Sequence, residues 1–155
     1  MNAKAKLEIL LVEDSPDDVV IVSEVLAGTK IKYNLNVPQD GAEALAFLHK
    51  EGKYAGSPRP DLILLDLNLP KIDGREVLAR IKADDGLKQI PVIVMSSSDQ
   101  AKDVNRAYEL HANCYIEKPS NLSQLIKVGK VIENWLGVIR LPDRKPDFRN
   151  ENSNN

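Results

Sequence analysis

Cysteine is nearly absent from this chain, because Cys114 is the only one among 155 residues. A single thiol can form neither an intramolecular disulfide nor a thiolate metal cluster, and such sparse cysteine is typical of a reducing compartment. Long apolar runs are also missing. No stretch approaches the ~18 apolar residues of a membrane span, and the opening MNAKAKLEIL lacks the apolar centre of a signal peptide. We therefore expect a cytoplasmic protein that does not enter a membrane.

An excess of positive charge is missing as well. The chain has 21 Lys and Arg against 23 Asp and Glu, which leaves a formal net charge of -2. Without a basic excess to neutralise a phosphate backbone, direct binding of DNA or RNA is disfavoured. The hydrophobic share of 43% and the charged share of 28% are those of a globular protein, and the length suits one domain.

Short apolar runs alternate with segments of helical length. Most runs show no alternation with polar residues, which is typical of strands buried on both faces of a parallel sheet. A run at 33–37 does alternate, and it predicts a strand that is open to solvent on one side. The predicted strands cover Leu7–Val12, Tyr33–Val37, Leu62–Leu65, Ile90–Met95 and Cys114–Ile116.

A helix start signal follows each of these runs. Ser15 and Pro16 combine an N-cap with a proline in the first turn, and Gly28 is a natural stop. Two further starts pair an aspartate with a glutamate three residues later, which predicts capping boxes. The predicted caps are Ser15, Asp40 (with Glu43), Asp73 (with Glu76), Ser98 and Ser120, and the last helix runs to Gly137.

This order of strands and helices predicts an α/β fold in which helices cover both faces of one parallel sheet. The expected form is a flavodoxin-like (βα)5, doubly wound sheet with strand order 2-1-3-4-5. In such sheets ligands bind at the carboxyl ends of the strands, near the point where the strand order reverses. The chemistry of the chain should therefore lie where its predicted strands end.

Three carboxylates stand at strand ends that this order makes neighbours. Glu13 and Asp14 follow the first strand, and Asp66 follows the third. Like charges in a partly buried cleft repel one another strongly, so a proton or a cation must lie among them. A set of oxygen ligands with one or two carboxylates suits Mg²⁺.

The fourth and fifth strands add a hydroxyl and an ammonium at the same edge. Ser96 ends the fourth strand, and Lys118 follows the fifth. Together with the carboxylates and a metal, these groups describe a site that receives a phosphoryl group on Asp66. The carboxylate is the nucleophile, the metal offsets charge on the phosphoryl oxygens, and the lysine and hydroxyl hold the remaining oxygens.

These motifs, in this order, resemble the receiver domains of two-component response regulators. They comprise Glu13-Asp14, the run Asp66-Leu67-Asn68-Leu69-Pro70 with Asp73-Gly74 behind it, Ser96, and Tyr115 three residues before Lys118-Pro119. The resemblance covers about residues 7–137. The string from Tyr108 to Pro119, with Trp135-Leu136 and Leu141-Pro142 further on, is similar to single-domain regulators paired with phytochrome-type photoreceptor kinases.

The resemblance implies a role for each matching residue. Asp66 matches the phosphoryl acceptor, and Glu13, Asp14, Asp66 and the main-chain carbonyl of Asn68 match a Mg²⁺ site. Ser96 matches the hydroxyl that bonds the phosphoryl group, and Lys118 matches the lysine that pairs with it. Tyr115 matches an aromatic that turns inward when the hydroxyl moves. The family also implies a cis peptide bond between Lys118 and Pro119.

The resemblance further implies a stand-alone switch rather than an enzyme. We expect an N-terminal tail at 1–6, a receiver domain at 7–137 and a C-terminal extension at 138–155. The expected phosphoryl donor is a histidine kinase, of the phytochrome type, and slow self-hydrolysis would reset the switch. A homodimer is expected through the face of the fourth helix, fifth strand and fifth helix, together with the C-terminal extension. The apolar start of that extension, Val138, Ile139 and Leu141, should pack on the domain or on the second subunit.

Other interpretations of the same residues remain open. A Mg²⁺-dependent phosphohydrolase could form an aspartyl-phosphate with the same carboxylates, but the acid-base aspartate that it needs two residues after the nucleophile is Asn68 here. A nucleotide or flavin binder lacks its glycine-rich loop in this sequence. Asp17 and Asp18 suit the positive end of a helix, with a water-mediated metal role as the alternative. Tyr115 could be plain core packing, and the charged set could be a salt-bridge network.

Overall fold

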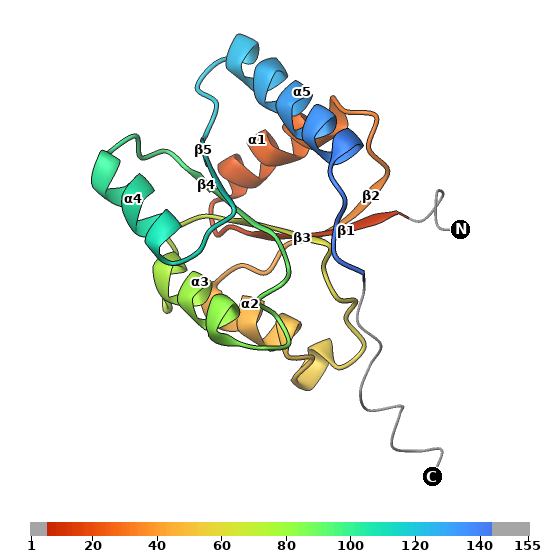
Figure 1. The fold of residues 1–155 in the computed structure, drawn as a ribbon, viewed down its shortest axis with the longest axis vertical. Coiled ribbons are helices and arrows are strands. Elements are labelled where there is room, and N and C mark those ends of the chain that lie inside the picture. Colours follow the sequence, from red (N-terminus) through yellow and green to blue (C-terminus); the bar gives the residue numbers. More distant parts are fainter. Residues whose placement is uncertain (1–5, 144–155) are drawn as a thin grey trace.

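A computed structural model describes residues 6–143 and shows one five-stranded parallel sheet (Figure 1). Its strand order is β2-β1-β3-β4-β5, as predicted, and every neighbouring pair is parallel. The strands are β1 (Leu7–Val12), β2 (Tyr33–Asn36), β3 (Leu62–Leu65), β4 (Val92–Ser96) and β5 (Cys114–Glu117). The fourth strand therefore begins two residues later than predicted, after Pro91, which has no backbone N–H to donate to the sheet.

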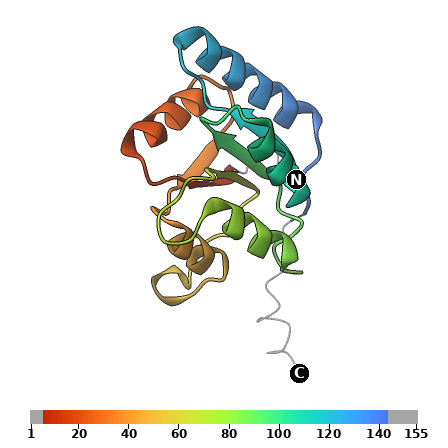
Figure 2. The ribbon, with the colours of Figure 1, turned by 90° about the vertical axis from the view of Figure 1, so that its left-hand side faces the viewer.

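Helices cover both faces of this sheet, α1 and α5 on one side and α2, α3 and α4 on the other (Figures 1 and 2). The helices are α1 (Pro16–Ala27), α2 (Gly41–Leu48), α3 (Gly74–Ala83), α4 (Ala101–Glu109) and α5 (Leu122–Val138), with a short 3-10 turn at Gly52–Tyr54. This arrangement confirms the doubly wound flavodoxin-like fold. It also places the loops that follow β1, β3, β4 and β5 along one edge of the sheet.

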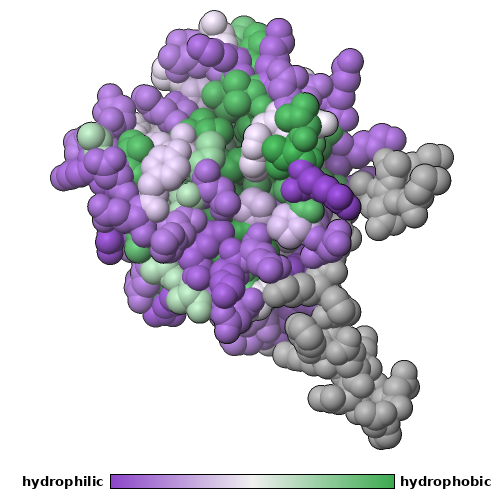
Figure 3. Space-filling model, viewed as in Figure 1, coloured by the Kyte–Doolittle hydropathy of each residue, from purple (hydrophilic) through white to green (hydrophobic). Residues whose placement is uncertain are grey.

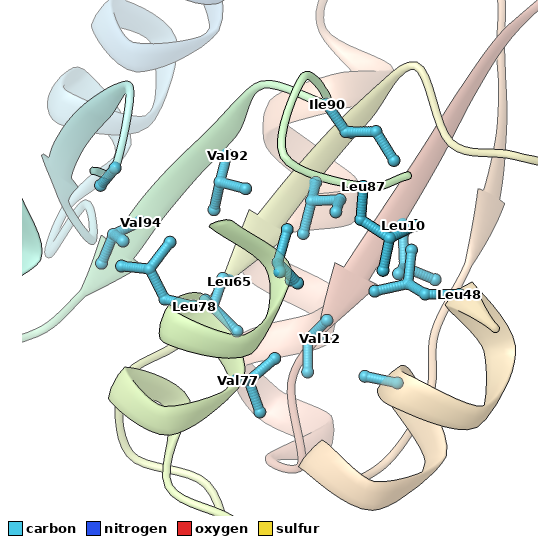
Figure 4. Packing of buried hydrophobic residues seen from close by; sticks show 14 of the residues in the cluster. Leu10, Val12, Leu48, Leu65, Val77, Leu78, Leu87, Ile90, Val92 and Val94 are labelled. Atoms are coloured by element: carbon cyan, nitrogen blue, oxygen red, sulfur yellow. The ribbon is translucent and has the colours of Figure 1, made fainter. Parts of the chain in front are cut away.

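The two faces of the sheet carry separate hydrophobic cores. Leu10 and Val12 point into the cluster under α2 and α3, whereas Ile9 and Leu11 point into the cluster under α1 and α5. Figure 4 shows how the first cluster interlocks. Because both faces are buried, the central strands need an apolar residue at every position, which explains their unbroken hydrophobic runs.

Two of the predicted helix starts are wrong. The cap of α4 is Gln100 rather than Ser98, because the Ser98 hydroxyl bonds a side chain within the helix and does not cap its first turn. The cap of α5 is Asn121 rather than Ser120, since the Asn121 side chain accepts the bond from the N–H of Gln124. Both serines lie one or two positions ahead of the true cap.

The remaining cap residues are as predicted, but neither predicted capping box is complete. At the start of α2 the Glu43 carboxylate accepts a bond of 3.4 Å from the N–H of Gln39, one residue before the cap, rather than from the N–H of Asp40. The side chains of Ser15 and Asp40 accept bonds from backbone N–H groups three residues on, and Asp73 also caps its helix. Asp73 is not part of a capping box, however, because its partner is the N–H of Arg75. The expected reciprocal glutamate, Glu76, instead pairs with Arg80 one turn along.

The peptide bond between Lys118 and Pro119 was expected to be cis, but it is trans, since no cis bond occurs within residues 6–143. For an X-Pro bond the trans form is the more stable by about 0.5–1 kcal/mol, so a cis form needs support from its surroundings. The expectation came from the family resemblance alone.

Segment 139–143 follows α5 and returns along the domain. Ile139 and Leu141 are half-buried, whereas Val138 is 85% exposed. Pro142 lies beside Arg59 and Pro91, at the edge of the sheet where β3 and β4 begin. The described part of the extension therefore packs on its own domain, at the opposite edge from the strand-end carboxylates. Most of the predicted N-terminal tail and residues 144–155 of the extension lie outside the described residues.

No helix within residues 6–143 is both long enough and apolar enough to cross a membrane.

Candidate functional site

Glu13 and Asp66 lie side by side where β1 and β3 end. Val12 pairs with Leu65 in the sheet, so the residues that follow these two leave the sheet together. Both residues are buried: Glu13 is 2% exposed and Asp66 is 6% exposed. Buried carboxylates that do not share a proton need a cation between them, as the sequence predicted.

Lys118 supplies one cation from the end of β5. Its Nζ lies 2.7 Å from Glu13 Oε2, 2.8 Å from Asp18 Oδ2 and 3.2 Å from Asp66 Oδ2. Its backbone N–H donates to the carbonyl of Ser96 at 2.8 Å, which fixes the start of its side chain beside β4. The lysine is itself buried, so one ammonium is shared by three carboxylates in a site that excludes most water.

Asp18 is the site residue for which the sequence favoured a purely structural role, with a metal role only as the alternative. It lies in the first turn of α1, and one of its oxygens lies within 4.8 Å of oxygens of Glu13 and Asp66. The signal in the sequence was an acid in a first helical turn, which the helix dipole alone explains equally well. The fold decides between an ordinary helix-start acid and a site residue. Helix α1 begins at the edge where β1 ends, so its first turn faces the neighbouring carboxylates.

The charges of this group are unbalanced. Burial raises the pKa of Glu13 to about 7, with the nearby charge of Asp66 adding to the effect, although the hydrogen bond from Lys118 acts in the opposite direction. Burial also disfavours the Lys118 ammonium, but hydrogen bonds to Asp18 and Glu13 and the charge of Asp66 hold its pKa above the ordinary value. Three acids and one base leave net negative charge in a buried place.

This donor set fits a divalent metal ion. Glu13, Asp18 and Asp66 each offer a carboxylate oxygen, and hard oxygen ligands of this kind suit Mg²⁺, Mn²⁺ or Ca²⁺. No histidine or cysteine joins the group among the described residues, so nothing in it favours zinc. Asp14, which was predicted as a ligand, is exposed and does not belong to the group.

The loop after β3 is folded tightly around Asp66. The N–H of Asn68 donates to Asp66 Oδ1 at 3.2 Å, and the N–H of Gly74 donates to the carbonyl of Leu67 at 2.9 Å. A Cβ on Gly74 would lie 2.2 Å from the carbonyl oxygen of Asp66 and 2.6 Å from the Cα of Leu67. Only glycine lets α3 start this close to the loop, which accounts for the Asp73-Gly74 pair in the sequence.

Ser96 and Tyr115 lie on neighbouring strands on the other side of Asp66. Ser96 is fully buried at the end of β4, and its Oγ accepts a bond of 3.2 Å from the N–H of Ser98. Tyr115 is half-buried, packs against the hydrophobic cluster under α2 and α3, and donates its hydroxyl to the carbonyl of Ser98 at 2.7 Å. The two predicted switch residues thus meet at one backbone segment, that of Ser98.

This chain is similar in sequence to known proteins of one family. A model described as "Response regulator receiver domain" matches residues 9–130. The response regulator Rcp1 of Synechocystis sp. is 53% identical over 135 residues, covering 86% of this chain and 92% of the relative. A probable methanogenesis regulatory protein, FilR2 of Methanothrix harundinacea, is 37% identical, with 92% of each chain covered.

Solved structures agree with these sequence matches. The Mn²⁺-bound form of Rcp1 superposes with a TM-score of 0.81 at 52% identity, covering 88% of this chain and 99% of that one. The phosphorylated cyanobacterial phytochrome response regulator RcpA superposes with a TM-score of 0.83 at 51% identity, covering 90% and 100%. The similarity confirms the predicted receiver fold and phosphorylation-dependent signalling, and it does not favour the phosphohydrolase. The chain belongs to the response regulator receiver domain family.

Proposed function

We propose that Asp66 is the residue that accepts the phosphoryl group. The observation that carries this proposal is the position of Asp66, buried at the end of β3, beside Glu13 and 3.2 Å from the Lys118 ammonium. A carboxylate oxygen of Asp66 attacks phosphorus, a P–O bond forms, and the P–N bond to a donor phosphohistidine breaks as the imidazole leaves.

We infer that the bound metal is Mg²⁺, held by Glu13, Asp66, the main-chain carbonyl of Asn68 and Asp14, directly or through water. Support comes from the oxygen-only donor set and from the Mn²⁺ found in Rcp1. When bound, Mg²⁺ neutralises the charge that develops on the phosphoryl oxygens. Asp18 adds negative charge on the same side and anchors Lys118.

Lys118 and Ser96 hold the phosphoryl group once it is on Asp66. The ammonium already lies against Asp66 and can pair with a phosphoryl oxygen, while the buried Ser96 hydroxyl can donate to another. When Ser96 moves for this purpose, Tyr115 turns inward, which alters the face formed by α4, β5 and α5. Slow hydrolysis of the acyl phosphate then resets the switch, so the chain acts as a phosphoryl acceptor rather than a turnover enzyme.

The proposed phosphoryl donor is a histidine kinase of the phytochrome type. Its support is the likeness to RcpA, which is named a phytochrome response regulator, and to a structure titled as a regulator in red light signalling of R. palustris, 30% identical with a TM-score of 0.81. Incubation with a radiolabelled phytochrome-type kinase should move label to this chain within minutes. A histidine kinase with a different sensor should transfer label far more slowly, and Asp66→Asn should accept none. Equal transfer from both kinases would overturn the choice of partner, and label on Asp66→Asn would overturn the acceptor.

We also propose a cytoplasmic homodimer formed through the face of α4, β5 and α5. Apolar side chains gather along α5 in Figure 3, and Leu122, Ile126 and Tyr108 on this face are 72%, 49% and 49% exposed. Exposed apolar groups that lie together mark interaction surfaces. Sedimentation that finds only monomer, with and without a phosphoryl mimic, would contradict the dimer. Val138, which is 85% exposed at the end of α5, is the part of the C-terminal extension that is proposed to add to the same contact.

A further inference from the structure

A chain of polar contacts runs from the backbone of Ser98 to helices α4 and α3. The Ser98 hydroxyl donates to Asp103 Oδ2 at 2.6 Å, and Asp103 Oδ1 accepts a bond of 2.9 Å from Arg75 Nη2. Arg75 also reaches Asp73, the cap of α3, at 3.3 Å. Asp103 is therefore held from two sides, by a hydroxyl of the loop after β4 and by a guanidinium at the start of α3.

Ser98 stands between the two switch residues. Its N–H donates to Ser96 Oγ at 3.2 Å, and its carbonyl accepts the Tyr115 hydroxyl at 2.7 Å. Neither Ser96 nor Tyr115 can leave its position without losing a bond to this one residue. A group that fixes Ser98 therefore resists the movement of both.

We infer that Asp103 is a positioning residue of the switch, which together with Arg75 holds Ser98 so that Ser96 and Tyr115 stay in the unphosphorylated arrangement. This inference rests on the proposed function, because it assumes that Ser96 and Tyr115 move when Asp66 is phosphorylated. It extends that function by tying the movement to α3 and α4 through side chains outside the phosphoryl-binding set. The Asp103 carboxylate is well suited to this role, since hydrogen bonds from Ser98 and Arg75 lower its pKa and keep it charged.

The contacts by which Asp103 and Arg75 hold Ser98, here called the clamp, should oppose phosphorylation. Phosphoryl transfer uses the arrangement in which Ser96 has left Ser98, so loosening Ser98 raises the population of that arrangement before phosphorylation. Loss of one charge-assisted hydrogen bond shifts such a population by about tenfold or more. Asp103→Ala should therefore speed phosphorylation by acetyl phosphate and Mg²⁺ by about tenfold.

The matched control is Glu109→Ala on the same helix. Glu109 also pairs with an arginine, Arg106, at 3.3 Å, but both side chains are more than half exposed and the pair does not touch Ser98. This variant should leave the rate of phosphorylation unchanged. If Glu109→Ala accelerates phosphorylation as much as Asp103→Ala does, the effect comes from weakening α4 in general and the inference is wrong.

A double-mutant cycle with Tyr115→Phe separates positioning from simple destabilisation. If Asp103 acts through Ser98 on the tyrosine hydroxyl, then Asp103→Ala should change the rate much less in the Tyr115→Phe background than in the wild type. Equal fold-changes in both backgrounds would overturn the inference. Should Asp103→Ala fail to fold, Ser98→Ala removes the hydroxyl that Asp103 holds but keeps the backbone contacts, and it should act in the same direction.

A second measurement distinguishes failure of this inference from failure of the proposed function. In the unphosphorylated protein, the NMR signals of the Tyr115 ring should shift in Asp103→Ala and not in Glu109→Ala. An unchanged Tyr115 ring contradicts the clamp, whatever the acceptor is. A shifted ring in a protein that takes no phosphoryl group on Asp66 would instead retain the clamp and refute the acceptor.

Discussion

The ammonium of Lys118 lies 2.7 Å from Glu13 Oε2, with both groups buried and 105 residues apart in the chain. The bond joins the end of β5 to the end of β1 across the width of the site. It means that the cation which is to pair with a phosphoryl group is already held by the carboxylates of the metal site. Binding of metal and the position of Lys118 should therefore be linked.

Lys118→Met tests this link. Removing the ammonium leaves three carboxylates without their shared cation, so metal-free stability should fall by about 3–5 kcal/mol at pH 8. Because the variant site is more negative, Mg²⁺ should raise its unfolding midpoint by more than it raises that of the wild type. Denaturant unfolding with and without Mg²⁺ measures both effects. The exposed Lys127→Met is the control, expected within about 0.5 kcal/mol of wild type, and an equal Mg²⁺ effect in all three proteins would show that Lys118 and metal are independent.

Asp18→Asn should weaken Mg²⁺ binding by about tenfold, since an acidic neighbour that orients or charges a metal site commonly contributes that much. Isothermal titration calorimetry gives the affinity directly. Asp17→Asn is the matched control, because Asp17 is the adjacent acid in the same helical turn but is exposed and outside the carboxylate group. An equal loss in both variants would mean that only the general charge of α1 matters.

Asp14→Asn belongs in the same titration. The family resemblance makes Asp14 a ligand, whereas the structure leaves it exposed and outside the group of Glu13, Asp18 and Asp66. A loss of affinity at least as large as that of Asp18→Asn supports Asp14 as a ligand. An affinity equal to that of the wild type would remove it from the proposed site.

Gly74→Ala should destabilise the protein by about 3 kcal/mol, because the added methyl group would overlap the backbone of the loop that carries Asp66. Phosphorylation should slow as well, since the acceptor loop must move to make room. Gly137→Ala is the control of opposite sign. Apart from its chain neighbours and the backbone of its own helix, nothing lies within 4 Å of its added Cβ. Alanine in place of a helical glycine should therefore stabilise α5 by up to about 1 kcal/mol. Thermal or denaturant unfolding measures the stability of both variants. A Gly74→Ala protein as stable as the wild type would contradict the tight packing of the loop against α3.

Asp40 offers a test by pH. The backbone N–H of Glu43 and the ion pair with Lys71 lower its pKa below the ordinary 3.8. A lowered pKa in the folded state means that the stabilisation is fully present above pH 3.8 and is lost as the pH falls through the folded value. Asp40→Ala should cost about 1 kcal/mol at pH 7. The difference from wild type should shrink at low pH, and Asp40→Asn, which keeps the cap, should cost less.

The fold could be predicted because its signals are local and agree with one another. Leu62–Leu65 is apolar at each position, which is typical of a strand covered on both faces. The caps at Ser15 and Asp40 are where their sequence patterns place them. The site followed from the same information. Once the strand order is known, residues after β1 and β3 must be neighbours, so the meeting of Glu13 and Asp66 needed no further evidence.

What the sequence could not show depends on side chains with more than one use. Ser98 reads as a helix cap but bonds Asp103 instead, because the loop after β4 continues for two more residues before α4 begins. His111 lies two residues after the end of α4 in a left-handed conformation, with φ 71°, where glycine is the usual choice, and a histidine does not indicate such a turn. Likewise, nothing local distinguishes Asp18 from an ordinary acid at a helix start.

Intact-mass spectrometry after incubation with acetyl phosphate and Mg²⁺ shows whether Asp66 carries the phosphoryl group. The wild type should gain the mass of one phosphoryl group and lose that gain slowly once acetyl phosphate is removed. Asp66→Asn should gain none, while the exposed control Asp17→Asn should behave as the wild type. A full gain of mass in Asp66→Asn, or none in the wild type, would refute Asp66 as the phosphoryl acceptor.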